Sequence, residues 1–397
     1  MKIAIVTTYF TEGMGYSENC LSKSLAQLGH EVHVITSEFN IYGSSSIYKK
    51  TYESFLGPAK VPAGKYNSEF YTIHRLKGSM IKGYVYINGL SSKLREIAPD
   101  IVHSLEIASI QTFKLALLKP FFKFKLFTET HQHLSVMKPY LLTNKRHFIL
   151  KKINYFITRK IPSFLSSFAV DKCYAISPDC GFVANKFYGI PNFKISIQPL
   201  GTDTNLFYPA TTENDIFNRN KLRELYGYAE DDIVCIYTGR FSDDKNPLIL
   251  AMAIDKLASQ DKKFKGIFIG DGLQEISIKN CSNVNILPFR KYVELAELYR
   301  MSDIAVWPTQ ESMSMLDACA SALPLIVSDK IGEMDRIDGN GLLFKHNDID
   351  DLIRCVYSLA SYDKRNKMGN MGREKMINNY SWQKIALNYV QDYQKYC

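Results

Sequence analysis

The sequence predicts an α/β protein of two domains, each built on a parallel β-sheet covered by helices. Apolar runs typical of strands buried on both faces alternate with segments of helical periodicity in both halves of the chain. A polar, turn-rich segment over residues 199–220 separates the two series and is interpreted as a linker. The length of 397 residues also exceeds what one ordinary core organises.

The first half begins with a buried strand over residues 2–8. A helix is predicted from Ser17, its N-cap, to Gly29, because a glycine is typical of a helix end. A strand over residues 31–36 completes a β–α–β unit, for which a right-handed crossover is expected. The other strands of this half are expected near 100–103, 125–129, 173–176 and 194–198.

The second half repeats the alternation. A strand over residues 232–240 leads to a helix with Asn246 as N-cap and Pro247 in its first position. Later strands are predicted within 265–269, 284–289, 303–309 and 323–329, and helices within 291–302, 314–322 and 349–360. Ligands of such sheets bind beyond the carboxyl ends of the strands, and the cleft between two such domains is the expected site.

The net charge of +9 originates in one segment of the chain. Residues 114–172 hold twelve Lys and Arg against two acidic residues, while the rest of the chain holds 37 basic and 38 acidic residues. Aromatic residues are interspersed among these cations, a combination that suits an anionic phospholipid surface or a nucleic acid. A solvated basic face without a partner is the alternative.

The cysteines and the apolar segments indicate the compartment. Eight cysteines are scattered without a Cys-x-x-Cys pair, which favours a reducing cytosol over a disulfide framework or a zinc site. No apolar stretch reaches the roughly 18 residues that a membrane span needs. Residues 1–10 run directly into polar residues and are interpreted as the first strand, not as a signal peptide. We therefore expect a cytoplasmic protein.

The segment "TGRFSDDKNP", at the end of the strand over 232–240, is the strongest local signal. Gly239 allows the backbone to pass close to a ligand, and Arg240 offers a planar fork for phosphate oxygens. Lys245 adds a compact positive charge beside a predicted helix N-terminus, which itself favours anions. Together these residues predict a diphosphate site. A surface salt bridge to one of the two aspartates in the segment is the alternative.

A second signal surrounds the helix predicted over 314–322, where Glu311 and Asp317 flank its start. An acidic side chain at the second position could bind the two hydroxyls of a ribose. The spacing of Ser314 and Asp317 also fits a capping box, in which the acidic residue caps the helix. From the spacing alone, the capping box is the slightly favoured interpretation.

The glycine loop after the first strand argues against a dinucleotide cofactor. The loop holds Gly13 and Gly15, but Glu18 stands where the fingerprint needs a third small residue, and the loop is too long for the tight turn. A nicotinamide or flavin enzyme is therefore disfavoured. The loop can still shape a substrate pocket, or it is a plain connection.

Two further sets of polar residues follow predicted strands. His131 and His133 come after the strand near 125–129, but no carboxylate or cysteine stands at ligand spacing, so they predict no metal site. His131 is a candidate for a hydrogen bond to a substrate, and a loop histidine without function is equally consistent. Gly270 and Asp271, in a Gly-Asp-Gly segment, either line the same cleft or form a turn.

The order of these motifs resembles family 4 of the glycosyltransferases, which are retaining, nucleotide-sugar-dependent enzymes with two facing Rossmann-like domains, the GT-B fold. The matching segments are "LGHEVHVIT", "KISIQPLGTDTNLFYP", "TGRFSDDKNP", "ELAELYRMSDIAVWPT" and "DGNGLLFKHND". The resemblance covers most of the chain and is strong from about residue 173 onward. It implies an acceptor-side domain over 1–205, a nucleotide-sugar-binding domain over 206–380, and a C-terminal helix over 381–397 that packs back on the first domain.

The resemblance also implies roles for single residues. Arg240 and Lys245 match the pair that holds the donor diphosphate. Asp317, one methylene shorter than the family's glutamate, matches the residue that holds the ribose. Glu311 resembles the acidic residue that contacts the transferred sugar, but it lies six positions before Asp317 instead of eight, where Thr309 stands.

The other implied site residues are spread over both domains. Pro288, Phe289 and Arg290 match the loop that meets the base, and His131 matches a histidine near the donor sugar. Gly15 lies in the loop that approaches the phosphate or the acceptor. The remaining donor-side positions are Gly239, Gly270, Asp271, Ser314 and Met315, and here Met313-Ser314 stands in place of the family's Phe-Gly.

This resemblance predicts transfer of a sugar from a nucleotide sugar to a hydroxyl of a lipid-linked or polysaccharide glycan intermediate, with retention and without a metal or cofactor. Residues 114–172 are then expected to seat the protein on the anionic inner face of the membrane. A nucleotide-sugar epimerase or hydrolase on the same fold and a non-catalytic glycan-assembly scaffold are the alternatives. A nucleic-acid partner is not expected, because it explains none of the motifs after residue 173.

Overall fold

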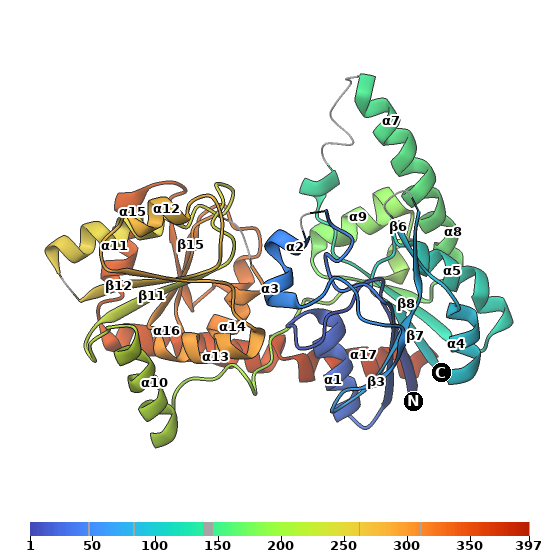
Figure 1. Cartoon of the computed structure of the whole chain (residues 1–397), viewed down its shortest axis with the longest axis horizontal. Coiled ribbons are helices and arrows are strands. Elements are labelled where there is room, and N and C mark those ends of the chain that lie inside the picture. The colour runs from blue at the N-terminus through green and yellow to red at the C-terminus, as the bar shows by residue number, and fades with distance from the viewer. Residues whose placement is uncertain (47, 82–83, 138–145, 262, 310–311, 397) are drawn as a thin grey trace. The chain divides into compact units, whose positions relative to one another are not determined.

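The computed structural model describes residues 1–397 except 47, 82–83, 138–145, 262, 310–311 and 397. Its contacts divide the chain into two compact units (Figure 1). Unit 1 comprises Met1–Leu200 and Ile385–Cys397, and unit 2 comprises Gly201–Lys384. The predicted domain limits at residues 205 and 380 differ from these bounds by a few residues.

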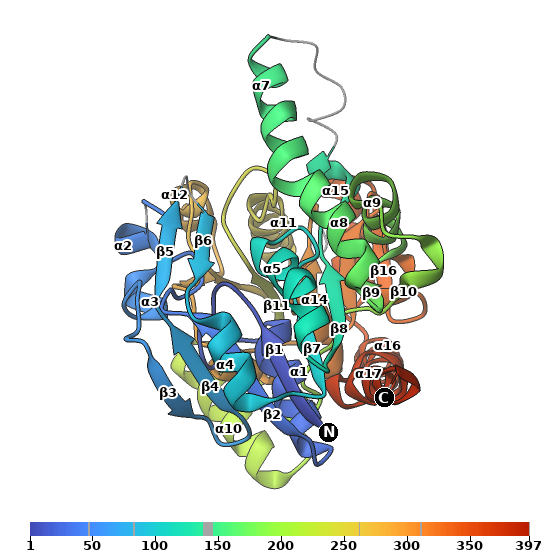
Figure 2. The same cartoon turned by 90° about the vertical axis from the view of Figure 1, so that its right-hand side faces the viewer.

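Unit 1 is built on a sheet of eight strands in the order β10-β9-β8-β7-β1-β2-β4-β3. Its strands are β1 (Lys2–Val6), β2 (Glu31–Ser37), β3 (Gly64–Asn67), β4 (Thr72–Leu76), β7 (Ile101–Ser104), β8 (Lys125–Thr130), β9 (Lys172–Ala175) and β10 (Ile195–Ile197). Neighbouring strands are parallel, except that β3 is antiparallel to β4. A separate antiparallel hairpin joins β5 (Gly78–Ile81) and β6 (Tyr84–Ile87) (Figure 2).

The helices of unit 1 cover both faces of this sheet. They are α1 (Ser17–Gln27), α2 (Tyr48–Thr51), α3 (Glu53–Leu56), α4 (Leu90–Ile97), α5 (Ile110–Leu118), η1 (Lys119–Phe121), α7 (Arg146–Tyr155), η2 (Phe156–Lys160), α8 (Ile161–Ala169), α9 (Pro178–Tyr188), η3 (Asn192–Lys194) and α17 (Trp382–Tyr396). Val6 and Leu126 share a core with residues of α4, α5 and α9. Because strand residues alternate between faces, Phe127 points to the other side, where its ring lies 4.6 Å from that of Tyr393 of α17.

Unit 2 is built on a fully parallel sheet in the order β13-β12-β11-β14-β15-β16. Its strands are β11 (Ile233–Thr238), β12 (Phe264–Ile269), β13 (Val284–Leu287), β14 (Ile304–Trp307), β15 (Leu325–Ser328) and β16 (Gly341–Phe344). Its helices are α10 (Glu213–Leu225), α11 (Leu248–Gln260), α12 (Glu275–Lys279), α13 (Tyr292–Met301), α14 (Ser314–Ala320), η4 (Met334–Arg336), α15 (Ile349–Ser358), α16 (Tyr362–Lys375) and η5 (Met376–Tyr380). Figure 1 shows α11, α12 and α15 over one face and α13, α14 and α16 over the other, which confirms the predicted layers.

Three local predictions are wrong. The segment interpreted as a linker contains α10, whose first turn is capped by Thr212 in a capping box with Asp215. Ser17 is the first helical residue of α1, and its N-cap is Tyr16, which makes no side-chain capping bond. Pro247 is the N-cap of α11, because Asn246 adopts a left-handed backbone angle, φ +46°, that places it before the helix.

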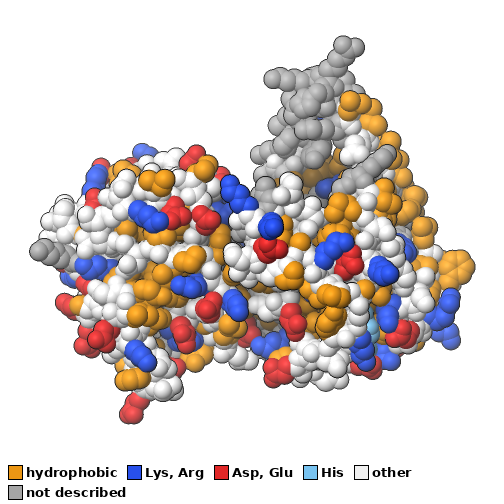
Figure 3. Space-filling model, in the orientation of Figure 1, with side chains coloured by type: hydrophobic (Ala, Val, Ile, Leu, Met, Phe, Trp, Pro, Cys, Tyr) orange, Lys and Arg blue, Asp and Glu red, His pale blue; other side chains and the backbone are white. Residues whose placement is uncertain are grey.

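The surface of unit 1 is unusual along α7 and α8. Figures 1 and 2 both show α7 extending away from the sheet of unit 1. Figure 3 shows hydrophobic side chains along the outer side of α7 and α8, where a surface helix ordinarily carries polar groups. Among the described residues, no helix combines the length and the hydropathy required to span a bilayer.

Candidate functional site

The predicted donor-binding residues lie beyond the carboxyl ends of four adjacent strands of unit 2, on the loops that leave these strands or in the first turn of α14. Gly239, Arg240 and Lys245 follow β11, Gly270 and Asp271 follow β12, Pro288, Phe289 and Arg290 follow β13, and Thr309, Ser314 and Met315 follow β14. The strand order reverses between β11 and β14, and such a switch point is where open α/β sheets bind their ligands. Glu311 lies outside the described residues.

Backbone hydrogen bonds join the first two of these loops. The amide of Gly239 donates to the carbonyl of Ile269 at 3.0 Å, and the amide of Phe241 donates to the carbonyl of Asp271 at 2.9 Å. At Gly270 φ is +156°, and a Cβ there would lie 1.9 Å from the carbonyl oxygen of Gly239. The Gly-Asp-Gly segment is therefore a close backbone contact that only glycine permits, and it holds the β11 loop in place.

Arg240 and Lys245 are on the surface of the β11 loop, just before α11. The Arg240 side chain is 65% exposed, and its guanidinium lies 3.9 Å from the Asp244 carboxylate, an exposed pair of little energetic weight. The pKa of Asp244 is lowered first by a hydrogen bond from Ser242 and then by the charges of Arg240 and Lys245. The predicted salt bridge thus exists only as a loose contact, which leaves the Arg240 fork accessible to an anion.

Thr309 is hydrogen-bonded to the loop that follows β11. Its hydroxyl donates to the backbone carbonyl of Asp244 at 2.6 Å. The residue eight positions before Asp317 is therefore in contact with the loop that carries Arg240 and Lys245. Which of Thr309 and Glu311 fills the first acidic-motif position stays a prediction.

Asp317 does not form the predicted capping box. The N-cap of α14 is Met313 and makes no side-chain capping bond, and the Ser314 hydroxyl lies 2.7 Å from that of Ser312. Asp317 is buried, and its Oδ1 accepts hydrogen bonds from Thr202 at 2.7 Å and from Tyr292 at 3.4 Å. Burial raises the pKa of Asp317 to about 7, although both hydrogen bonds oppose this shift.

In unit 1, His131 belongs to a buried polar cluster. Its Nε2 lies 2.8 Å from Oε2 of Glu129, a residue of β8 that is 2% exposed. Oε1 of Glu129 accepts a hydrogen bond from Tyr389 of α17 at 2.8 Å and lies 3.1 Å from Nε2 of His103. The Nδ1 of His103 in turn lies 2.5 Å from the hydroxyl of Tyr393. Glu129 therefore connects His131 to the C-terminal helix.

The charges around His131 favour an ion pair. Burial lowers the pKa of His131, but the hydrogen bond to Glu129 and the charges of Glu129, Glu106 and Glu18 outweigh it and raise the pKa above its usual value. Burial raises the pKa of Glu129, but the nearby imidazoles of His103 and His131 bring it well below its usual range. His131 is one-third exposed, so the imidazole that pairs with the buried Glu129 carboxylate reaches the surface.

The glycine loop of unit 1 leads into this cluster. Gly15 follows β1 and is partly buried, and the next helix brings Glu18 close enough to raise the pKa of His131. Burial raises the pKa of Glu18 itself to about 7. The residue that disfavours a dinucleotide fingerprint is thus an acidic neighbour of His131.

His133 has neighbours that local spacing does not reveal. Its Nδ1 lies 2.8 Å from the Asp179 carboxylate, and ligand atoms of His133, Asp179 and Cys180 all lie within 4.8 Å of one another. The Asp179 carboxylate also accepts from the backbone amide of Leu134 at 2.9 Å. The expectation that the reaction needs no metal is not tested by this group and stays a prediction.

Several residues of both clusters were not predicted from the sequence. They are Thr202, Tyr292, His103, Glu106, Glu129, Tyr389 and Tyr393. A glutamate inside the apolar run of β8 is the one signal that could have indicated the unit 1 cluster, since a charge in a buried strand needs partners. The partners themselves lie up to 260 positions away along the chain.

Two family models match the chain. The model described as "Glycosyltransferase Family 4" matches residues 13–206, and the model described as "Glycosyl transferases group 1" matches residues 232–361. Together they cover most of both compact units and include the loops after β8, β11, β12, β13 and β14.

Two sequence relatives of known name each match about half of this chain. The chain is 26% identical over 216 residues to the spore coat protein SA of Bacillus subtilis, covering 49% of this chain and 57% of that protein. It is 26% identical over 203 residues to the UDP-Gal:α-D-GlcNAc-diphosphoundecaprenol α-1,3-galactosyltransferase of Escherichia coli, covering 47% and 51%. The matches thus span about half the length of these relatives. The α-monoglucosyldiacylglycerol synthase of Acholeplasma laidlawii is 22% identical over 83% of this chain and 80% of its own.

Solved structures share the whole fold. A glycosyltransferase from Rickettsia africae has a TM-score of 0.68 and 18% identity, covering 99% of this chain and 98% of its own. The Anabaena protein Alr3699/HepE in complex with UDP has a TM-score of 0.68 and 16% identity over the full length of both chains. Structural similarity at 16–18% sequence identity establishes only the fold, whereas the two family models establish the family. The chain belongs to glycosyltransferase family 4, and its two Rossmann-like units form the GT-B fold.

Proposed function

We propose that this protein is a retaining glycosyltransferase that moves a sugar from a nucleotide-sugar donor to a hydroxyl of a lipid-linked or polysaccharide glycan intermediate. The observation that carries the proposal is the accessible Arg240 fork on the switch-point loop of unit 2, which also carries Lys245. The names of the relatives support a lipid-linked acceptor: one is a galactosyltransferase acting on a diphosphoundecaprenol-linked sugar, and one is a glucosyldiacylglycerol synthase. Anabaena HepE was solved with UDP-glucose, which supports a nucleotide-sugar donor.

The proposed reaction breaks the bond between the anomeric carbon and the donor phosphate oxygen. Negative charge then grows on the leaving diphosphate, and the preorganised charges of Arg240 and Lys245 stabilise it without a metal. The acceptor hydroxyl forms the new glycosidic bond on the same face of the sugar, and its proton passes to the leaving phosphate. The products are a glycoside of unchanged anomeric configuration and a nucleoside diphosphate, and no side-chain nucleophile takes part.

Unit 1 is proposed to serve the acceptor side. His131, whose pKa is raised by its hydrogen bond to Glu129, is suited to hydrogen-bond an oxygen of the donor sugar from the unit 1 side. We further propose that the protein works at the cytoplasmic face of a membrane, because residues 114–172 concentrate its positive charge.

A screen of nucleotide sugars tests the function. Purified protein is mixed with each donor and with extracted lipid-linked glycans, and both nucleotide release and the new glycoside are followed. The anomeric coupling constant of the product, measured by NMR, is expected to match that of the donor. An inverted product would refute retention, nucleotide release without a glycoside would indicate a hydrolase, and binding without turnover would indicate a scaffold.

Asp317 gives a pH-dependent prediction. Its carboxyl has a pKa of about 7, so it is mostly protonated at pH 6 and mostly ionised at pH 8. Only the carboxylate accepts hydrogen bonds from both ribose hydroxyls, so donor affinity is expected to rise from pH 6 to pH 8. The variant Asp317→Asn is expected to bind about tenfold more weakly at pH 8 and to lose this rise.

Calorimetric titration with a nucleotide sugar measures this, since its diphosphate has no group that titrates near neutral pH. The difference between the wild-type and Asp317→Asn profiles isolates the Asp317 carboxyl from other titrating groups. Parallel profiles for the two proteins would exclude the ribose role of Asp317.

A further inference from the structure

The continuous helical segment α7–η2–α8, residues 146–169, exposes a row of large apolar side chains. Their exposed fractions run from 40% to 72%: Leu150 72%, Ile153 49%, Ile157 58%, Ile161 40%, Phe164 48%, Leu165 48% and Phe168 72%. Successive members are one, three or four positions apart, which places them along one side of a helix. We call this row the apolar stripe.

The polar side chains of α8 point the other way. Ser163, Ser166 and Ser167 are all at most 3% exposed. Hydroxyls of the segment and its neighbours bond inward: Ser163 donates to the carbonyl of Ile107 at 3.4 Å, and Tyr155 donates to that of Phe187 at 3.2 Å. A helix on the surface of a globular protein ordinarily buries its apolar side and exposes its polar side. Here the arrangement is inverted, so the stripe is not the packing face of the fold.

The charge of the same segment indicates what covers the stripe. Residues 146–169 contain five cations and no Asp or Glu: Arg146, Lys151, Lys152, Arg159 and Lys160. The adjoining η1 adds Phe121, which is 81% exposed, followed by the exposed Lys123. The Lys119 ammonium joins η1 to the end of α8 by donating to the carbonyl of Ala169 at 2.6 Å. A partner of this surface must therefore be apolar inside and negatively charged at its boundary.

We infer that the apolar stripe inserts into the headgroup–acyl boundary of an anionic phospholipid bilayer, with the neighbouring lysines on the headgroups. Such a bilayer satisfies both requirements, and an apolar helix face combined with a basic cluster supplies the two signals that stable interfacial binding needs. The segment lies on the surface and does not span, in agreement with the absence of a spanning helix among the described residues. The inference rests on the proposed function in one respect: membrane contact would bring the protein to a lipid-linked acceptor.

Vesicle flotation without donor or acceptor tests the binding. The wild-type chain is expected to float with vesicles of phosphatidylcholine and phosphatidylglycerol at least about tenfold better than with phosphatidylcholine alone. The stripe variant Ile157→Ser/Phe168→Ser is expected to lose about tenfold or more of this binding. The charge variant Lys152→Gln/Lys160→Gln is expected to lose a similar amount, and only on the anionic vesicles.

A matched control separates the stripe from exposed apolar area in general. Phe217 and Leu225 of α10 are 65% and 73% exposed, close to the 58% and 72% of Ile157 and Phe168. The variant Phe217→Ser/Leu225→Ser is expected to float like the wild type. If it loses binding equally, the stripe has no special role. If the stripe variant floats normally while sedimentation shows that it has lost self-association, the stripe is a contact between copies of this chain, and the inference is overturned.

Insertion is measured directly by fluorescence. The two native tryptophans, Trp307 and Trp382, are 2% and 3% exposed, so a new tryptophan at the surface can be distinguished. In Phe168→Trp, lipids brominated on the acyl chain are expected to quench the emission, whereas in Phe217→Trp they are not. Equal quenching in both variants would overturn the inference. Transfer to a water-soluble acceptor is assayed separately. The membrane-binding result can therefore be interpreted even if the proposed reaction is not observed.

Discussion

Replacing Lys245 with alanine is expected to slow sugar transfer about 100-fold or more, because removing one group that stabilises a developing oxyanion typically lowers the rate by that factor. Lys245 lies before the N-terminus of α11, on the loop that hydrogen-bonded contacts join to the β12 loop. In the proposed reaction, its charge acts on the diphosphate most strongly when the bond between the anomeric carbon and the phosphate oxygen is breaking. The fall should therefore appear mainly in kcat, with a smaller change in KM for the donor.

Lys256 offers a matched control for this variant. It lies on α11, its side chain is 53% exposed, and its ammonium lies 3.4 Å from the exposed Asp350 carboxylate. Lys256→Ala removes the same charge from the helix behind the loop and is expected to retain wild-type turnover. Unchanged kcat in Lys245→Ala, with wild-type melting behaviour, would remove Lys245 from the reaction.

The sheets were predictable because buried parallel strands leave a strong local pattern. The strands expected near residues 2–8, 31–36 and 232–240 are present, and their carboxyl ends carry the loops singled out as sites. Strand ends of one parallel sheet share an edge, so residues from separate motifs come together once the strands are placed. This is why Thr309, after β14, and the loop that carries Arg240 and Lys245, after β11, lie in contact although they are far apart in the sequence.

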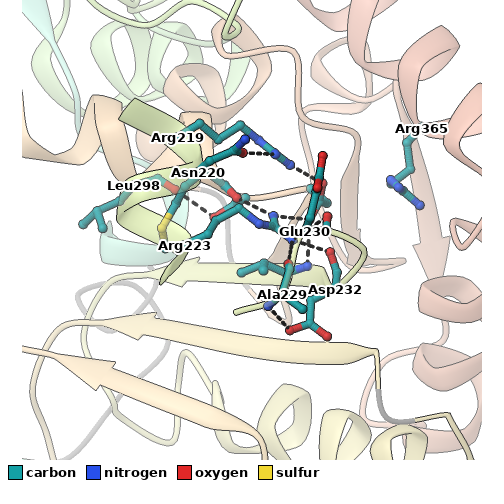
Figure 4. A network of polar contacts seen from close by, with 12 residues as sticks. Arg219, Asn220, Arg223, Ala229, Glu230, Asp232, Leu298 and Arg365 are labelled. Carbon is teal, nitrogen blue, oxygen red and sulfur yellow. Dashed lines mark hydrogen bonds and ion pairs between the residues drawn. The ribbon is translucent and has the colours of Figure 1, made fainter. Parts of the chain in front are cut away.

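Helix α10 shows where local pattern fails. It buries only Arg223, so its sequence has the polar composition of a linker. Arg223 is 1% exposed and donates to the backbone carbonyl of Met301 and to the carboxylate of Asp303. It also donates to the backbone carbonyl of Asp232, beside which it lies in Figure 4. The helix is therefore held to the residues just before β11 and β14 largely by the guanidinium groups of Arg223 and Arg219, and hydrophobic periodicity cannot reveal such anchors.

Asp317 and the apolar stripe also show that the surroundings of a single side chain cannot be predicted from local sequence. The spacing of Ser314 and Asp317 favours a capping box, but the carboxylate bonds Thr202, which lies 115 positions earlier. The charge of residues 114–172 is visible in the sequence, whereas the inversion of α8 requires knowing that Ser163 and Ser166 face inward. In both cases the deciding contact joins segments that are distant along the chain.

Replacing Glu129 with leucine is expected to lower the free energy of unfolding by about 3–5 kcal/mol, the cost of breaking a buried charged network on one side. Glu129 is 2% exposed, is hydrogen-bonded to His131 and Tyr389 and lies 3.1 Å from His103, so leucine would leave three polar groups without their carboxylate. Tyr389→Phe removes one hydroxyl from the same carboxylate and is expected to cost only about 1 kcal/mol. Denaturant unfolding followed by circular dichroism measures both. Equal costs for the two variants would mean that the carboxylate is not the centre of the cluster.

Glu129→Gln keeps the shape and removes the charge, so it isolates the ion pair with His131. The stability due to the raised pKa of His131 is present below its ordinary value of about 6.5 and is lost as the pH rises through the folded value. The stability due to the lowered pKa of Glu129 is present above its ordinary value of about 4.3 and is lost as the pH falls. The wild type should therefore exceed Glu129→Gln most between about pH 4.5 and 6.5. NMR titration should show a lower pKa for His131 in the variant, and an unchanged pKa would mean that Glu129 does not set the charge that His131 presents to a sugar.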